Sequence, residues 1–386
     1  MMKVKLGDVC EIVSGSTPKT GIAEYWNGDI KWITPAEINE DSIEIYDTER
    51  KITELAVKKT NLNVLPKGTV LLSSRAPIGK VAIVGEEMYC NQGFKNLICS
   101  EKIYNKYLYW FLKCNTGYLN SLGRGATFKE ISKSIVENIK IELYPIEEQK
   151  EIANTLDKIS ELISLRRQQI EKLDGLVKAR FVELFGDPVD NPMGWSTKQL
   201  QELVTDDCTI SYGIVQTGDD QEEGVPVFRP VDIVNRIPVR SELKKTTEEI
   251  SNKYKRTILK GREMLITVRA NIADTCIVGE EFTGCNVGRG IVPIRTREDE
   301  MILEFLKYQI DSKHLNDNIK ALAKGITLIQ LNMEDLREVT LIVPPIEKQK
   351  SFIEFAKQTE KSKLAIQRSL AELKTLKKAL MQKYFG

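Results

Sequence analysis

Apolar residues recur at alternating intervals of four and three in two stretches, 145–186 and 345–386. A 3.5-residue period is typical of a coiled-coil seam, and a helix of about 40 residues is roughly 60 Å long and needs a partner. Pro145 suits the first turn of a helix, and Gly186 with Asp187-Pro188 ends the first one. We therefore predict two long helices that pair as an antiparallel coiled-coil spacer. The predicted seam consists of Ile152, Leu156, Ile159, Ile163, Ile170, Leu173, Val177, Phe352, Ile366, Leu370, Leu373 and Leu380.

Basic residues interrupt both seams. Arg166 and Arg180 occupy seam slots of the first helix, and Lys363 and Lys377 occupy slots of the second. The arginines either pair with acidic residues across the coiled coil, or set its register and face a partner protein. We favour pairing across the coiled coil.

The segments that precede the helices, 1–144 and 187–344, have another pattern. Short apolar runs are separated by glycine and proline, which predicts mixed, β-rich domains. The predicted fold is therefore α+β: two β-rich domains in tandem, separated by two long helices that form an antiparallel coiled coil with pseudo-two-fold symmetry.

The chain repeats itself. The helix starts Pro145-Ile146-Glu147 and Pro345-Ile346-Glu347 match at an offset of 200, and the other matches in order drift only from about 193 to 200. We also match Cys90-Asn91 with Cys285-Asn286. The stretches between matches differ, as expected for one framework that recognises two different targets.

The composition and the charge of the chain limit the classes of protein to which it can belong. The chain has 386 residues, 29% of them charged, and a formal net charge of +1, so any nucleic-acid binding must use local basic patches. No apolar run approaches a membrane span, and the N-terminus has no apolar signal core. Seven cysteines without a C-x-x-C pair favour a reducing compartment. We expect a cytoplasmic protein that binds no membrane.

Catalytic motifs are missing from the sequence. It contains no phosphate-binding loop, no H-E-x-x-H and no G-x-S-x-G, and its single histidine, His314, argues against a histidine-based hydrolase or a multi-histidine metal site. The spacing of Glu148-Gln149-Lys150 occurs in some nucleases, but this triplet lies at a helix start. We expect neither a catalytic residue nor a metal site.

DNA contact is the function that the loops favour. Basic residues lie in glycine-containing loops, where a backbone can approach a phosphate, and Asn, Gln and Arg on loops can read base edges. The predicted DNA-binding residues are Lys31, Trp32, Thr34, Arg75, Lys80, Asn91, Gln92, Lys95, Arg124, Thr127, Lys129, Arg229, Arg269, Asn271, Asn286, Arg289, Lys324 and Thr327.

The ordered and duplicated motifs resemble those of the specificity subunit of type I restriction-modification systems, essentially end to end. The resemblance rests on the two Pro-Ile-Glu-x-Gln-Lys helix starts, the junction from Phe185 to Trp195, and the stretches Arg75-Ala76-Pro77-Ile78-Gly79 and Asn91-Gln92-Gly93-Phe94. Asn271 and Ala273 replace Pro77 and Gly79 in the second half, so we expect different DNA contacts there.

This resemblance implies two target recognition domains that each read one half of an interrupted site in double-stranded DNA. It implies that the helices dock two modification (methyltransferase) subunits and, through them, restriction (translocase/endonuclease) subunits. S-adenosylmethionine, ATP and Mg²⁺ are then expected on those partners, with no cofactor in this non-catalytic chain. A self-contained nuclease or methyltransferase and a stand-alone DNA-binding regulator are the alternatives.

Overall fold

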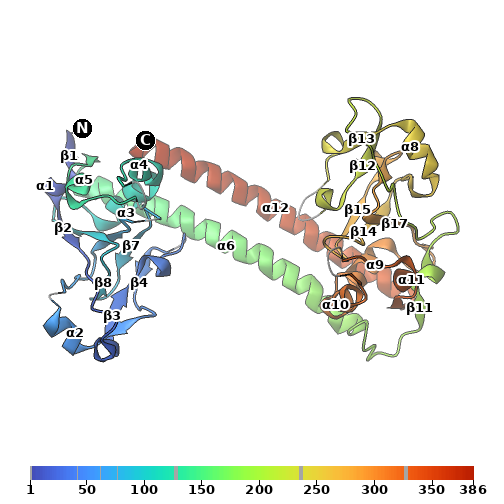
Figure 1. Cartoon of the computed structure of the whole chain (residues 1–386), viewed down its shortest axis with the longest axis horizontal. Helices are drawn as coiled ribbons and strands as arrows, with labels where there is room; N and C mark the ends of the chain where they lie inside the picture. Colours follow the sequence, from blue (N-terminus) through green and yellow to red (C-terminus); the bar gives the residue numbers. More distant parts are fainter. Residues whose placement is uncertain are drawn as a thin grey trace. The chain divides into compact units, whose positions relative to one another are not determined.

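A computed structural model describes residues 2–40, 42–60, 62–75, 77–125, 129–233, 238–325 and 329–386. The chain forms two compact units (Figure 1). Unit 1 comprises Met1–Gln168 with Gln367–Gly386, and unit 2 comprises Gln169–Ile366. Each unit therefore contains one β-rich domain and parts of both long helices.

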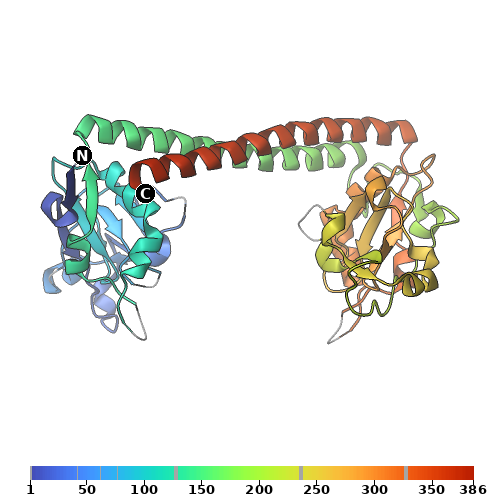
Figure 2. The same cartoon turned by 90° about the horizontal axis from the view of Figure 1, so that it is seen from above.

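The two long helices form as predicted. Helix α6 spans Ile146–Phe185 and helix α12 spans Ile346–Phe385, within one residue of the predicted ends. In unit 1, the first part of α6 lies beside the last part of α12 and runs in the opposite direction (Figures 1 and 2). None of the described helices combines the length and the apolar character needed to cross a bilayer.

The domain of unit 1 is built on three small sheets. Their strand orders are β2-β9-β6-β7-β4, β5-β3-β8 and β1-β10. The strands are β1 (Met2–Lys5), β2 (Cys10–Ser14), β3 (Trp26–Ile33), β4 (Glu44–Ile45), β5 (Lys51–Ile52), β6 (Val70–Leu72), β7 (Val81–Val84), β8 (Tyr89–Cys90), β9 (Lys95–Cys99) and β10 (Lys140–Leu143). The short helices are α1 (Leu6–Val9), α2 (Glu54–Lys59), α3 (Asn105–Cys114), α4 (Thr116–Ser121) and α5 (Lys133–Glu137).

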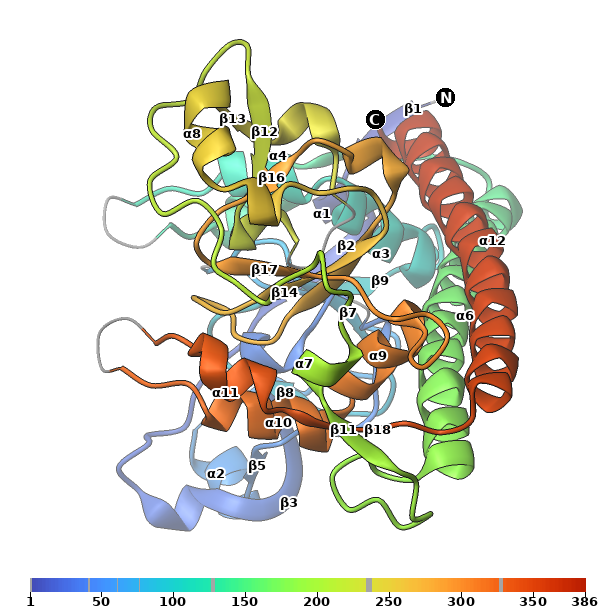
Figure 3. The ribbon, with the colours of Figure 1, turned by 90° about the vertical axis from the view of Figure 1, so that its right-hand side faces the viewer.

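The domain of unit 2 repeats this plan. Its sheets have the orders β15-β14-β17, β13-β12-β16 and β11-β18, and α9 packs against β14 and β15 (Figure 3). The strands are β11 (Thr197–Gln199), β12 (Val225–Phe228), β13 (Lys244–Thr246), β14 (Glu263–Thr267), β15 (Thr275–Val278), β16 (Asn286–Val287), β17 (Ile291–Ile294) and β18 (Thr340–Ile342). The helices are α7 (Leu200–Leu203), α8 (Glu248–Lys253), α9 (Leu303–Ile310), α10 (Lys313–Ala321) and α11 (Met333–Arg337). The predicted α+β class with two tandem domains is confirmed.

The ends of the long helices belong to the domain cores, which the seam prediction did not anticipate. In unit 1, Ile152 and Leu156 join a core built around the buried face of α3, and Leu380 packs against it. In unit 2, Val177 and Phe352 join the core around α9. Apolar periodicity shows which face of a helix is buried but does not show what covers it.

The remaining seam residues lie between these ends. Ile159 and Ile163 are buried, whereas the rest are half-buried: Ile170, Leu173, Ile366, Leu370 and Leu373. Arg180 pairs with Glu183 on its own helix at 2.8 Å, so the favoured pairing across the coiled coil is wrong for this arginine.

The junction after α6 explains the Phe185–Trp195 motif. Gly186 has φ 76° and ends the helix in the left-handed conformation that favours glycine. The Asn191 side chain accepts the Trp195 N–H at 2.9 Å and donates to its carbonyl at 2.8 Å. The Trp195 indole N–H in turn donates to the Phe185 carbonyl at 3.1 Å, which ties the turn back to the helix end.

Candidate nucleic-acid interface

A surface hollow of about 380 Å³ in unit 1 brings five of the predicted DNA-binding residues together. It lies among three loops that follow β3, β6 and β8. Its lining consists of Thr34, Pro35, Ala36, Arg75, Pro77, Lys80, Asn91, Gln92 and Gly93. These residues are up to 59 positions apart in the sequence, and the fold collects them at one place.

Polar side chains hold the loops of this hollow. Thr34 donates from its N–H and its hydroxyl to Glu37 Oε1, at 2.8 and 2.9 Å. Lys80 Nζ donates to the Pro35 carbonyl at 2.9 Å, and Asn91 Oδ1 accepts the Gly93 N–H at 2.8 Å. These contacts fix the backbone, while the Gln92 side chain is exposed.

Glu130 organises the basic side of the hollow. Its Oε2 lies 3.0 Å from Arg75 Nε, and its Oε1 lies 3.3 Å from Lys95 Nζ. Burial alone would raise the pKa of Glu130, but hydrogen bonds from Lys95 and Arg75 outweigh burial and hold it below its usual range. The Arg75 side chain is 48% exposed, so it remains accessible to a ligand.

Glu130 lies at one end of a loop whose other end is Arg124. Backbone hydrogen bonds close it, from Arg124 N–H to Glu130 O at 3.0 Å and from Glu130 N–H to Arg124 O at 2.9 Å. Arg124 and Lys129 are exposed on this loop. The predicted residue Thr127 lies outside the described residues.

Unit 2 repeats the framework with different side chains. Arg269 Nε donates to Gln330 Oε1 at 2.7 Å, as Arg75 does to Glu130. The Lys324 and Gln330 backbones pair like those of Arg124 and Glu130. Arg289 is exposed there, whereas Thr327 lies outside the described residues. The two sites therefore share a backbone but differ in charge, because a neutral amide replaces the Glu130 carboxylate.

The first loop of the framework also recurs. Arg229 begins the turn that Thr34 begins in unit 1, and its guanidinium binds both carboxylate oxygens of buried Asp232, at 3.0 and 2.9 Å. A Cβ at Gly290 would come within 2.7 Å of Pro230 Cγ. This close packing explains why a glycine occupies this position and the equivalent position of unit 1, Gly93.

The expected difference at Asn271 and Ala273 concerns side chains and not the turn. Gly79 N–H donates to Ser73 O at 3.1 Å, and Ala273 N–H donates to Thr267 O at 2.9 Å. Ala273 keeps the positive φ of Gly79, 62° against 94°. Asn271 is exposed on this shared turn, so it offers an amide where unit 1 has a proline ring.

Four of the predicted contacts need correction. Trp32 is 1% exposed and donates its indole N–H to Ser16 O at 3.2 Å, so it supports the fold and cannot reach a base. Lys95 is buried against Glu130. Lys31 is half-buried, pairs with Glu86 at 2.5 Å and does not line the hollow.

Asn286 is the fourth. It is fully buried, accepts from Thr257 Oγ1 at 2.7 Å and donates to Ser251 Oγ at 3.0 Å. The predicted match of Cys90-Asn91 with Cys285-Asn286 is also out of register. Ile33 and Phe228 are equivalent residues, and Ile33 pairs with Cys90 whereas Phe228 pairs with Val287. The structural counterpart of Asn91 is therefore Gly288.

The structure also reveals a buried pair of glutamines that motif reasoning left without a role. Gln149 Oε1 accepts the Tyr104 N–H at 2.8 Å, and its Nε2 donates to Lys102 O and Tyr144 O at 3.0 and 2.8 Å. Gln349 makes the same three bonds in unit 2. The recurrence of Pro-Ile-Glu-x-Gln-Lys was the signal. Glu148 and Lys150 lie two positions apart on α6 and therefore point to different sides of the helix, which argues against the nuclease interpretation of Glu148-Gln149-Lys150.

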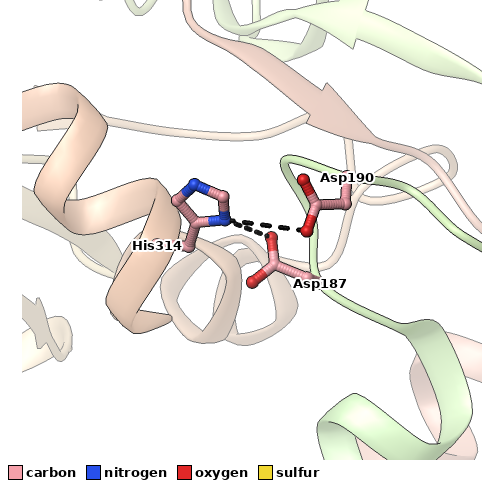
Figure 4. Close-up of side chains that lie close together, drawn as sticks. All are labelled: Asp187, Asp190 and His314. Atoms are coloured by element: carbon pink, nitrogen blue, oxygen red, sulfur yellow. Dashed lines mark ion pairs between the residues drawn. The ribbon is translucent and has the colours of Figure 1, made fainter.

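One group in unit 2 has the composition of a metal site (Figure 4). Ligand atoms of Asp187, Asp190 and His314 lie within 4.8 Å of one another. His314 Nδ1 lies 3.3 Å from Asp187 Oδ1, which already accepts the Val189 N–H at 2.8 Å. These contacts are those of a partly exposed ion pair attached to a turn.

Replacing Arg75 by alanine is expected to lower DNA affinity about tenfold. If Arg75 contacts a phosphate, the slope of log Kd against log salt also falls by about 1, because one fewer counterion is released. Fluorescence anisotropy with duplex DNA at several salt concentrations measures both quantities. Lys3→Ala, which removes an exposed ion pair outside the hollow, is the control. Unchanged affinity in the Arg75 variant would exclude this residue from the interface.

The similarity to known proteins covers both halves of the duplicated chain. The profile of the family described as type I restriction modification DNA specificity domain matches residues 1–174 and 192–375. The type I restriction enzyme MjaIX specificity subunit from Methanocaldococcus jannaschii is 31% identical over 412 residues, which cover 98% of this chain and 91% of that protein. The EcoBI specificity subunit from Escherichia coli is 23% identical over 330 residues, covering 78% and 69%.

Solved structures show the same fold. A chain from a study of assembly and conformational transition of the type I restriction-modification system aligns with a TM-score of 0.64 at 22% identity, covering 100% of this chain and 97% of that chain. The S subunit of a type I system from M. genitalium aligns with a TM-score of 0.60 at 14% identity, covering 100% and 96%.

Proposed function

This chain belongs to the family of type I restriction-modification DNA specificity proteins, and from that premise we propose that each of its units reads one half of an interrupted DNA site. The observation that carries the proposal is the repeated framework around the hollow. Turns and backbone pairings recur in both units, while the accessible side chains change from Gln92 to Arg289 and from Glu130 to Gln330. A fixed backbone positions readers, and different side chains select different bases.

The partners form the second part of the proposal. The long helices dock two modification subunits, and restriction subunits join through them. S-adenosylmethionine, ATP and Mg²⁺ then act on those partners, while this chain supplies sequence recognition and no chemistry. Among its described residues, the hollow offers arginine, lysine and amide groups, which suit binding to DNA, and its Thr34 hydroxyl donates to Glu37 within the turn that both residues form.

Exchange of residues 187–344 for the corresponding domain of another specificity protein tests the bipartite reading. The expected result is a change in one half of the methylated sequence, with the other half retained, because unit 1 keeps its own hollow. Sequencing of modified adenines in cells that express the hybrid with its modification subunits measures this. Arg297→Ala, a surface change that breaks an exposed ion pair in unit 2, is the control. A change in both halves would contradict one unit for each half-site.

Purified chain incubated with S-adenosylmethionine and DNA separates this proposal from a self-contained enzyme. We expect no methyl transfer until modification subunits are added. Methyl transfer by the chain alone would favour the enzyme alternative.

A further inference from the structure

A second hollow of unit 1, of about 490 Å³, lies between α6, α12 and the end of α3. Its charged lining residues are all cations: Arg167, Lys374, Lys377 and Lys378. No aspartate or glutamate is among its described lining residues. We call it the basic pocket. Four cations around one opening make a local positive potential in a chain whose net charge is only +1.

The basic pocket combines this charge with an apolar surface. Ile163 and Met381 contribute to its lining, and Ile163 is buried. Lys377 Nζ lies 4.6 Å from the centre of the Trp110 ring, a cation–π contact that holds the lysine in place. Lys374 and Lys378 are exposed, so their ammonium groups are accessible to a ligand.

Unit 2 has the equivalent hollow, of about 610 Å³, at the same place in its fold. The long-helix positions correspond at an offset of 200, so Lys374 answers Asp174, Lys378 answers Lys178 and Ser160 answers Glu360. Before the long helices the offset is 198, because Tyr104 donates to Gln149 as Ile302 donates to Gln349. Cys114 of unit 1 therefore corresponds to Ser312 of unit 2. Both of these residues line their hollows.

The charge of the hollow is reversed between the two units. Three lysines in unit 2, Lys178, Lys313 and Lys363, face five carboxylates: Asp174, Asp187, Asp311, Asp317 and Glu360. Lys363 Nζ lies 2.7 Å from Asp174 and 3.6 Å from Glu360. We call this second hollow the acidic hollow. The hollow therefore recurs at the same place in both units, while the net charge of its lining changes from positive to negative.

We propose that the basic pocket docks an acidic segment of a partner protein, whose apolar side chain covers Ile163 and Met381, and that the acidic hollow excludes the same segment. Charge complementarity supports an acidic occupant, and like charges across an interface cost several kcal/mol. The apolar lining fits a peptide side chain better than a phosphate. The pocket is lined by α6, α12 and the end of α3, and it shares no lining residue with the hollow around Arg75.

Under the proposed function, on which this step rests, the partner is the modification subunit. Two identical copies of it then meet two electrostatically different sites on one chain. The copy at unit 1 binds more tightly at low salt and loses this advantage as salt rises, because exposed charges are screened. Assembly therefore proceeds in order, with unit 1 occupied first.

A labelled peptide tests the pocket on the purified full-length chain. The probe is fluorescein-labelled Glu-Glu-Leu-Glu-Glu-Leu-Glu-Glu. The same peptide with every glutamate replaced by glutamine is its neutral counterpart. Fluorescence anisotropy should show one acidic peptide bound per chain and weak binding of the neutral one. Lys374→Glu with Lys378→Glu should weaken binding at least about tenfold. Lys140→Glu with Lys158→Glu makes the same charge change at exposed positions of unit 1 outside the pocket, and should leave binding unchanged.

A gain of binding completes the test. Asp174→Lys with Glu360→Ser gives the acidic hollow the side chains of unit 1 at these two positions, and should raise the number of bound peptides from one to two. Two peptides bound to the unaltered chain, equal binding of the neutral peptide, or unchanged binding by the Lys374/Lys378 variant would each overturn the proposal. So would loss of duplex DNA binding in that variant with no effect on the peptide, since the pocket would then serve DNA. Half-site recognition is measured on methylated DNA and the pocket on the isolated chain, so the two proposals fail separately.

Discussion

Replacing Gln149 by leucine is expected to lower the free energy of unfolding of unit 1 by about 3 kcal/mol, because three buried or part-buried hydrogen bonds to the backbone are lost. The glutamine is fully buried, and its amide bonds one N–H and two carbonyls where α6 begins. Leucine has a similar volume but can satisfy none of these groups. Hydrogen exchange followed by mass spectrometry measures the loss and locates it in unit 1.

Two controls accompany the glutamine experiment. Lys150 is the next residue along the helix after Gln149. Lys150→Ala breaks only its exposed ion pair with Glu147, so it should lower the free energy of unfolding by less than about 1 kcal/mol. Gln349→Leu should give the same large loss, located in unit 2. If Gln149→Leu and Lys150→Ala had equal effects, the buried glutamine would not be the link between helix and domain.

Replacing Phe385 by alanine should destabilise unit 1 by about 3 kcal/mol, although this residue lies some 240 positions beyond the rest of the domain. Phe385 is 8% exposed and packs on Tyr107 and Phe111, with ring centres 5.2 and 6.2 Å apart. Its removal leaves a cavity in the core that α3 builds. Denaturant unfolding with hydrogen exchange on α3 peptides measures the effect.

Leu376 provides the matched control for Phe385. It lies on the same helix but is 48% exposed, so Leu376→Ala should change stability by at most about 0.5 kcal/mol. Phe185→Ala, at the equivalent position, should destabilise unit 2, where Phe185 packs on Phe305 at 4.8 Å. Protection of α3 that is unchanged in the Phe385 variant would show that α12 does not complete the first core.

Sequence reasoning located the long helices because their boundaries are marked by residues with strong conformational preferences. Pro145 and Gly186 mark the start and the end of α6 through their own backbone preferences, and the spacing of the apolar residues identifies the buried face of the helix. Period could not show that Ile152 and Leu156 face a domain core while Ile170 does not, since all three occupy the same heptad slots. The predicted two-fold relation between the halves stays a prediction.

The hollow was predictable as a set of residue types but not as a site. Thr34, Arg75 and Gln92 were chosen for their chemistry, and only the fold brings them together. Trp32 and Asn286 were chosen by the same criteria and are buried, because residue type does not encode which face of a strand points inward. The false match of Asn91 with Asn286 arose from identical letters, and strand pairing corrects it.

Under the proposed function, this chain directs methylation to one interrupted DNA sequence. The most direct measurement is single-molecule sequencing of modified adenines in the source cell, with this gene present, deleted and restored. We expect that one two-part methylated motif disappears on deletion and returns on restoration, while every other motif is unchanged. An identical set of methylated motifs in all three strains, with the modification subunits expressed, would contradict it.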